Sequence, residues 1–189
     1  MGLFVISELQ DLAREVTPQG IYFSKSAATV LNESIEKQAS LRHFDIFLSH
    51  AFADAEVVLG IKLKLESYGN SVYVDWIDDP KLDRSSVNSD TAEVLKERMD
   101  DCSALFWATS DSSSQSKWMP WECGYFDGKK EKVAILPVTE ERTNSYSGQE
   151  YLGLYPFVLE GRYEGESTDD LFIRFKDDSV ETFTRWVKK

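Results

Sequence analysis

Cysteine and histidine are scarce in this chain of 189 residues, which contains two of each. Cys102 and Cys123 are too few for a disulfide scaffold and do not have the spacing of metal ligands. His43 and His50 are too few to build a typical zinc site. The sequence therefore predicts no disulfide framework, no metal site and no bound cofactor.

Basic residues are also in short supply. The 21 Lys and Arg residues stand against 33 Asp and Glu residues, which gives a net charge of −12. A field of that sign repels nucleic-acid phosphates and anionic lipid. We therefore expect neither a nucleic acid nor a membrane surface among the partners.

Long hydrophobic runs are missing as well. No apolar stretch approaches the roughly 20 residues that a membrane-spanning helix needs. The opening "MGLFVISELQ" lacks the basic region and long apolar run of a secretory signal. Ile6 occupies the position where a myristoylation signal needs Ser or Thr. These features predict a cytoplasmic protein.

What the chain does have is 42% hydrophobic and 13% aromatic residues, enough for one globular domain with a sizeable core. Residues 1–42 are predicted to form two short helices, as a helical extension that packs on the domain or serves oligomerisation. Residues 43–189 are predicted to form the main domain.

Within the main domain, predicted strands and helices alternate. The predicted strands are 44–49, 71–74, 103–108, 133–138 and 155–161, and the predicted helices are 53–68 and segments that start at 90, 116 and 169. Such alternation favours an α/β fold with a doubly wound parallel sheet of five strands, flavodoxin-like, in the order 2-1-3-4-5. Ligands of such sheets bind at the carboxyl ends of the strands, here between the loops 49–54 and 109–117.

One carboxylate stands out in "SKWMPWECGYFDG", residues 116–128. At about 100° per residue, Glu122 shares roughly a third of the helix circumference with three aromatic residues. These are Trp118, Trp121 and Tyr125. An inward carboxylate costs several kcal/mol unless it is compensated. Glu122 is therefore either a boundary residue paired with Lys117 or Arg84, or a functional carboxylate that faces the predicted crevice.

Three segments together resemble a Toll/interleukin-1 receptor (TIR) domain of bacterial type. They are "FDIFLSHAFAD" (44–54), "VYVDWIDD" (72–79) and the segment 116–128, which has the family's Ser-x-Trp-x-x-x-Glu pattern. The resemblance covers residues 43–138. The loop after Asp75 departs from it, because Ser85 stands where many relatives have glycine.

The resemblance implies that Glu122 is the catalytic residue for cleavage of NAD+ at the bond between nicotinamide and ribose, with NAD+ as substrate. A single carboxylate suits this reaction. The pyridinium leaves as a neutral base and needs no general acid, so the second carboxylate of ordinary glycosidases is unnecessary. The remaining requirement is stabilisation of positive charge on the ribose.

The resemblance also suggests further substrate-binding residues. Ser49, His50 and Phe52 are expected beside the nicotinamide and its ribose. Asp75 is expected either to shape the loop that follows it or to help form the site, and Trp76 to close over the ligand or to cap the core. Two residues at the start of the 116–128 helix complete the predicted site: Lys117 for the phosphates, and Trp118, for which packing is the alternative.

The functional prediction is an NAD+-cleaving TIR enzyme, either a glycohydrolase or an ADP-ribosyl cyclase or transferase. By resemblance to antiphage (Thoeris-like) proteins, its product is expected to signal to a separate effector protein, and the chain to assemble through TIR–TIR contacts. Two alternatives remain open: a non-enzymatic TIR scaffold, and an enzyme like the nucleoside deoxyribosyltransferases.

Overall fold

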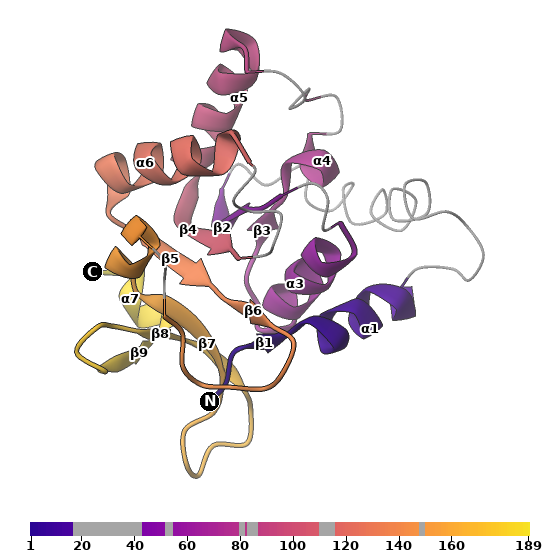
Figure 1. Ribbon diagram of the computed structural model, residues 1–189, viewed down its shortest axis with the longest axis vertical. Coiled ribbons are helices and arrows are strands. Elements are labelled where there is room, and N and C mark those ends of the chain that lie inside the picture. The colour runs from indigo at the N-terminus through magenta and orange to yellow at the C-terminus, as the bar shows by residue number, and fades with distance from the viewer. Residues whose placement is uncertain (17–42, 52–54, 80–81, 83–86, 110–115, 148–149) are drawn as a thin grey trace.

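A central sheet of seven strands, covered by helices on both faces, forms the body of the protein (Figure 1). The computed structural model describes residues 1–16, 43–51, 55–79, 82, 87–109, 116–147 and 150–189. The order of the strands is β3-β2-β4-β5-β7-β8-β9. Their bounds are β2 Phe44–Ser49, β3 Val72–Tyr73, β4 Cys102–Ala108, β5 Val133–Leu136, β7 Phe157–Gly161, β8 Asp170–Arg174 and β9 Val180–Thr182.

Two helical layers enclose this sheet (Figure 1). The helices are α1 Ile6–Val16, α3 Ala55–Ser67, α4 Asp75–Asp78, α5 Ser89–Asp100, α6 Trp118–Lys130 and α7 Phe183–Trp186, with a 3-10 turn, η3, at Glu150–Leu154. One apolar cluster joins the sheet to α1, α3 and α7, and a second joins it to α5, α6 and η3. The first five strands of the order pair in parallel. The α/β class with a mostly parallel sheet is thus confirmed.

The predicted number of strands was wrong, and so was the predicted last helix. The chain from Asp169 onward forms β8 and β9, both antiparallel, and only then the short α7. Phe172, Phe175 and Phe183 recur at helix-like intervals, but the three consecutive residues 171–173 are all buried, as in a strand. Pairing with the open edge of β7 overrides the helical spacing, because it satisfies the backbone of both strands.

The N-terminal segment packs against the main domain. β1 (Phe4–Val5) pairs in parallel with β6 (Val138–Thr139), forming a second sheet of two strands. Gly2 exchanges two backbone hydrogen bonds with Glu160, and α1 lies on α3 (Figure 1). Residues 1–16 therefore pack on the main domain. The second predicted helix lies outside the described residues, and the division at residue 42 remains a prediction.

The contact between α1 and α3 depends on a missing side chain. A Cβ placed on Gly60 of α3 would lie 2.0 Å from the backbone oxygen of Leu9. That separation is far inside van der Waals contact, so any larger residue must push the two helices apart. Gly60 is thereby the position that lets α1 reach the core.

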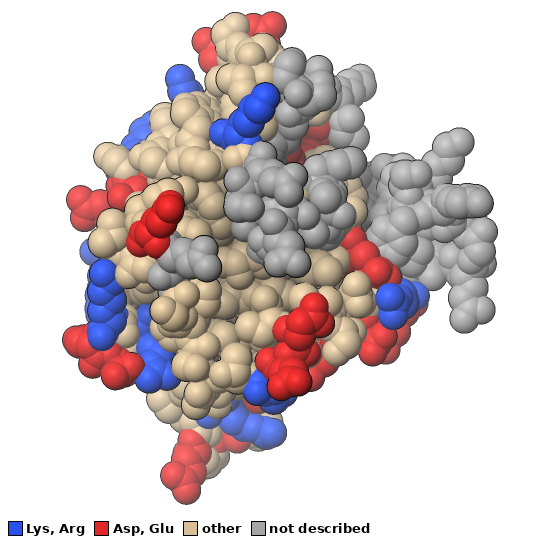
Figure 2. All heavy atoms as spheres, viewed as in Figure 1, with Lys and Arg blue, Asp and Glu red and all other residues tan. Residues whose placement is uncertain are grey.

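On the face shown in Figure 2, the described Lys and Arg side chains are interspersed with Asp and Glu. No helix among the described residues has both the length and the apolar character needed to cross a bilayer.

We expect Gly60→Ala to lower the free energy of unfolding by about 1–3 kcal/mol, the usual cost of overpacking a core. Gly124→Ala is the matched control, because the Cβ added to this helical glycine meets nothing within 4 Å. There the better helix propensity of alanine should stabilise the protein by up to about 1 kcal/mol. Urea unfolding of both variants measures the difference, and equal stabilities would contradict the close-approach argument.

Candidate active site

Glu122 points into the protein. It belongs to the second turn of α6, its residue exposure is 0%, and its Oε2 accepts a hydrogen bond of 2.6 Å from Ser49 Oγ. Ser49 is the last residue of β2 and is equally buried. The bond therefore joins α6 to the carboxyl end of a central parallel strand, which is where ligands of such sheets bind.

The start of α6 determines which side chains face inward. Ser116 Oγ accepts a hydrogen bond of 3.2 Å from the backbone N–H of Met119 and so caps the first turn. Trp118 and Glu122, four residues apart, share the buried side of the helix. Lys117 is exposed at the helix start. The carboxylate thus lies on the buried face of α6, which also carries Met119, Cys123 and Phe126. Of the three predicted aromatics, only Trp118 is on this buried face.

The indole of Trp118 packs edge-on against Trp121, with 5.5 Å between ring centroids, and Trp121 in turn stacks on Tyr125 at 5.9 Å. Trp121 and Tyr125 are half-buried, whereas Trp118 is buried. These three aromatic side chains therefore run from the buried site toward the surface. Of the two pairing partners considered for Glu122, Arg84 lies outside the described residues.

A second cluster forms around His50, the residue after Ser49. His50 Nδ1 lies 2.8 Å from the backbone oxygen of Leu48, which can only accept, so Nδ1 carries a proton. Trp76 donates its Nε1–H to His50 Nε2 over 3.0 Å. His50 therefore has the neutral Nδ1–H tautomer. Both ring nitrogens are engaged within the protein.

Asp75 completes this cluster, with Oδ1 3.3 Å from His50 Nε2. Asp75 and Trp76 begin α4, which directly follows β3, so the cluster ties α4 to the end of β2. The structure thus groups the predicted residues in two sets, Ser49 with Glu122 and His50 with Asp75 and Trp76. Phe52 lies outside the described residues.

The predicted crevice lies between loops that the structure describes only in part, because 52–54 and 110–115 are outside its described residues. Two cavities of about 610 and 660 Å³ lie elsewhere, and neither is lined by a predicted site residue. Among the described residues, no group of three or more His, Cys, Asp or Glu side chains is placed to hold a metal ion.

Charged residues of α4 and α3 lie near the second cluster. Asp78 Oδ2 accepts a hydrogen bond of 2.7 Å from the backbone N–H of Val74, and buried Lys62 donates to the oxygen of Val72 and pairs with Glu66. Burial raises the pKa of Asp78 to about 6, although nearby Lys62 acts to lower it. Sequence reasoning missed both Lys62 and Asp78, since each lies on an element whose packing only the fold defines.

One more residue near the carboxylate was not predicted as part of the site. Trp107 on β4 is the register partner of Ser49 and packs in the same apolar cluster as Trp118 and Met119. Its place within a strand made it look like an ordinary core residue.

Comparison with known proteins identifies relatives of this chain. The TIR domain family matches residues 46–172. A Bacillus cereus (strain MSX-D12) protein named "Probable 3' cyclic ADP-D-ribose synthase ThsB'" is 43% identical over 192 residues that cover all of both chains. A Cytobacillus dafuensis protein named "Putative cyclic ADP-D-ribose synthase TIR2" is 31% identical over 83 residues, 43% of this chain and 22% of that protein.

The raised pKa of Asp78 predicts a pH dependence of stability. Its value of about 6 in the folded protein exceeds the ordinary 3.8, so the folded state holds this proton more tightly than the unfolded state. The stabilisation is complete below about pH 4 and is lost as pH rises through 6. Relative to Asp78→Asn, the wild-type protein should therefore lose up to about 3 kcal/mol between pH 4 and 7. Urea unfolding across that range measures it, and a constant difference would refute it.

Proposed function

This chain belongs to the TIR domain family, and from that premise we propose that it cleaves NAD+ with Glu122 as the catalytic residue. The observation that carries the proposal is the buried carboxylate of Glu122, held by the Ser49 hydroxyl at the carboxyl end of β2. In this role the protein releases nicotinamide and makes a nucleotide derived from ADP-ribose.

The reaction suits a lone buried carboxylate. The bond between C1′ of the ribose and the pyridinium nitrogen breaks, its electron pair stays on the nitrogen, and nicotinamide leaves as a neutral molecule. Positive charge then develops on the ribose, and an ionised carboxylate in a water-poor site stabilises it strongly. Ser49 donates to Oε2 of Glu122, which orients the carboxylate for its role at the ribose.

The names of the relatives support a proposal for the acceptor of the ribosyl group. Both are named as cyclic ADP-D-ribose synthases, and the full-length relative as a 3' cyclic one. We therefore propose that a hydroxyl of the substrate itself attacks C1′ and loses its proton, which closes a ring. Water as acceptor would give linear ADP-ribose instead.

Other predicted residues receive supporting roles in this proposal. Both ring nitrogens of His50 are hydrogen-bonded, one to Leu48 and one to Trp76, so His50 positions α4 beside the site. Asp75 contributes to the same cluster. Lys117, exposed at the start of α6, is available to the diphosphate, and Trp118 packs behind Glu122.

The biological setting is also part of the proposal. NAD+ is abundant in the cytoplasm, which supports a cytoplasmic location for the protein. By resemblance to bacterial TIR proteins of antiphage defence, the product signals to a separate effector protein, and catalysis occurs in a homo-oligomer formed through TIR–TIR contacts.

The two alternatives fit the site less well. A TIR scaffold without catalysis has no need for a carboxylate at 0% exposure, whose burial is costly. An enzyme of the deoxyribosyltransferase kind has no counterpart in the relatives, which are named for products of ADP-ribose.

The proposal predicts that Glu122→Gln lowers the rate of nicotinamide release by at least ~100-fold, because the amide cannot stabilise the ribose cation. Glu97→Gln, the same change on the exposed side of α5, is the control and should keep the wild-type rate. Chromatography of the products from NAD+, at several protein concentrations so that assembly is sampled, provides the measurement. Equal rates for the wild-type and Glu122→Gln proteins would remove Glu122 from the mechanism.

Loss of the Ser49 hydroxyl should be milder. Ser49→Ala leaves Glu122 in place but removes the bond that orients it, so we expect kcat to fall by about 10-fold or more with little change in KM. A hydrogen bond that served only folding would instead lower the melting temperature and leave kcat of the folded enzyme intact. Steady-state kinetics beside a thermal melt separates the two.

A further inference from the structure

Outside the His50 cluster, two buried polar side-chain atoms have no hydrogen-bond partner within the part of the chain that the structure describes: Glu181 Oε2 and Trp107 Nε1. Glu181 Oε2 lies 2.6 Å from the positively charged Lys189 Nζ. The indole N–H of Trp107 is the one whose lack of a partner needs explanation, because a buried donor left unbonded is costly.

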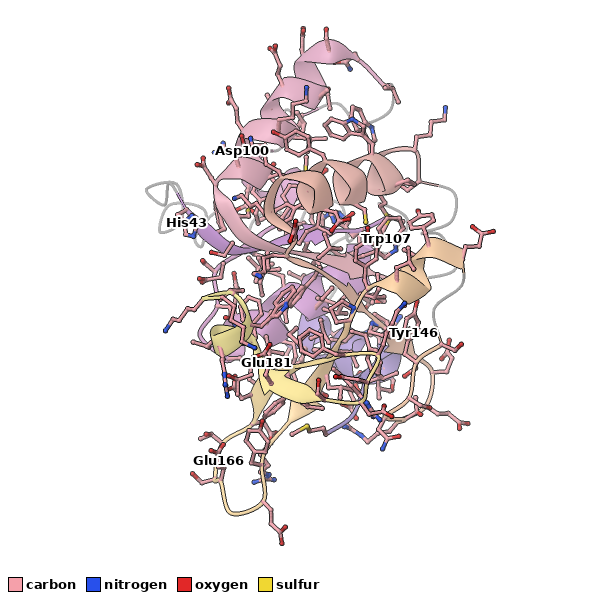
Figure 3. The ribbon with its side chains drawn as sticks, turned by 90° about the vertical axis from the view of Figure 1, so that its left-hand side faces the viewer. His43, Asp100, Trp107, Tyr146, Glu166 and Glu181 are labelled. Carbon is pink, nitrogen blue, oxygen red and sulfur yellow. The ribbon has the colours of Figure 1, made fainter. Side chains whose placement is uncertain are left out.

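Trp107 lies beside the proposed catalytic pair. It is the register partner of Ser49 in the parallel pairing of β2 with β4, at roughly 4.8 Å between strands. Side chains in register on adjacent strands point to the same face. Trp107 therefore shares with Ser49 the face of the sheet that α6 and Glu122 cover. Figure 3 shows Trp107 beneath α6 and next to η3.

The surroundings of the indole are apolar and aromatic. Trp107 is 2% exposed and packs in one cluster with Trp118, Met119 and Cys123. Its ring meets Tyr151 of η3 edge to face, with 6.3 Å between centroids and 82° between planes. These contacts hold the ring in place but give its N–H no hydrogen bond.

We propose that Trp107 Nε1–H recognises the nicotinamide end of the substrate by donating a hydrogen bond to its carboxamide oxygen. The inference rests on the proposed function. A donor buried among apolar and aromatic side chains suits a flat aromatic base with one carbonyl acceptor. An anionic diphosphate in the same place would need charged donors, because an uncompensated charge is not stable among apolar groups.

The proposal predicts different effects of one substitution in the free protein and in its complex with substrate. In the free protein the N–H makes no hydrogen bond among the described residues, so Trp107→Phe there costs only the packing of the lost ring volume. In the complex the same change also removes a bond to the substrate. Trp107→Phe should therefore weaken NAD+ binding by the protein that remains folded.

Binding is measured best where no turnover occurs. In the Glu122→Gln background, calorimetric titration with NAD+ should show Kd rising roughly 10-fold on Trp107→Phe, about the value of one neutral hydrogen bond. Trp186→Phe is the matched control, because this buried tryptophan lies in α7 on the opposite face of the sheet. It should leave Kd within about 2-fold. If Trp107→Phe fails to fold, replacement of Trp107 by 3-benzothienylalanine keeps the ring shape and removes only the N–H.

Substrate analogues identify the acceptor. The dinucleotide of 3-acetylpyridine keeps the carbonyl oxygen, and that of thionicotinamide replaces it with sulfur, a poorer acceptor. Trp107→Phe should weaken binding of NAD+ and the acetylpyridine analogue equally, and affect the thionicotinamide analogue by less than about 3-fold. An equal penalty for all three, or none for NAD+, overturns the inference.

Failure of the proposed function would look different. If wild-type protein releases no nicotinamide and the Glu122→Gln protein binds no NAD+, both the function and this inference fall. If wild-type protein is active and Kd is the same with and without the Trp107 N–H, the inference alone falls.

Discussion

The hydrogen bond between Ser49 and Glu122 is the constraint on which the arrangement of this site depends. It spans 2.6 Å between two residues of 0% exposure and ties the second turn of α6 to the end of β2. A carboxylate in that position is expensive to bury unless it is hydrogen-bonded, and the Ser49 hydroxyl supplies one such bond. The proposed reaction brings positive charge next to this carboxylate. The pyridinium and the ribose cation of NAD+ cleavage are charges of that kind.

The rest of the site holds this pair in place from two sides. On one side, His50 connects the backbone of β2 to Trp76 of α4, and Asp78 of α4 accepts a backbone hydrogen bond from Val74 near the charge of Lys62. On the other side, Trp107 of β4, in register with Ser49, contributes an aromatic side chain. Parallel strands thus bring residues that are far apart in the sequence to one site: 26 residues separate His50 from Trp76, and 73 separate Ser49 from Glu122.

Local patterns predicted the α/β class and placed Glu122 and Trp118 together on one side of α6, the side that the structure buries. They failed for the residues after 169. Phe172 and Phe183 fit a helical spacing, yet the open edge of β7 recruits that segment as β8 and β9. Helical periodicity is a local property, whereas the availability of an unpaired strand edge depends on the whole sheet.

The sequence by itself determined that the chain is acidic and poor in metal ligands, and that Glu122 lies on the aromatic face of a helix. These features depend on composition and on spacing along one element. Only the tertiary structure decided that Ser49 bonds this carboxylate, that both nitrogens of His50 are occupied, and that the Trp107 N–H has no bond among the described residues. Each of these depends on strand register and on helix packing, which bring together residues that no local pattern connects.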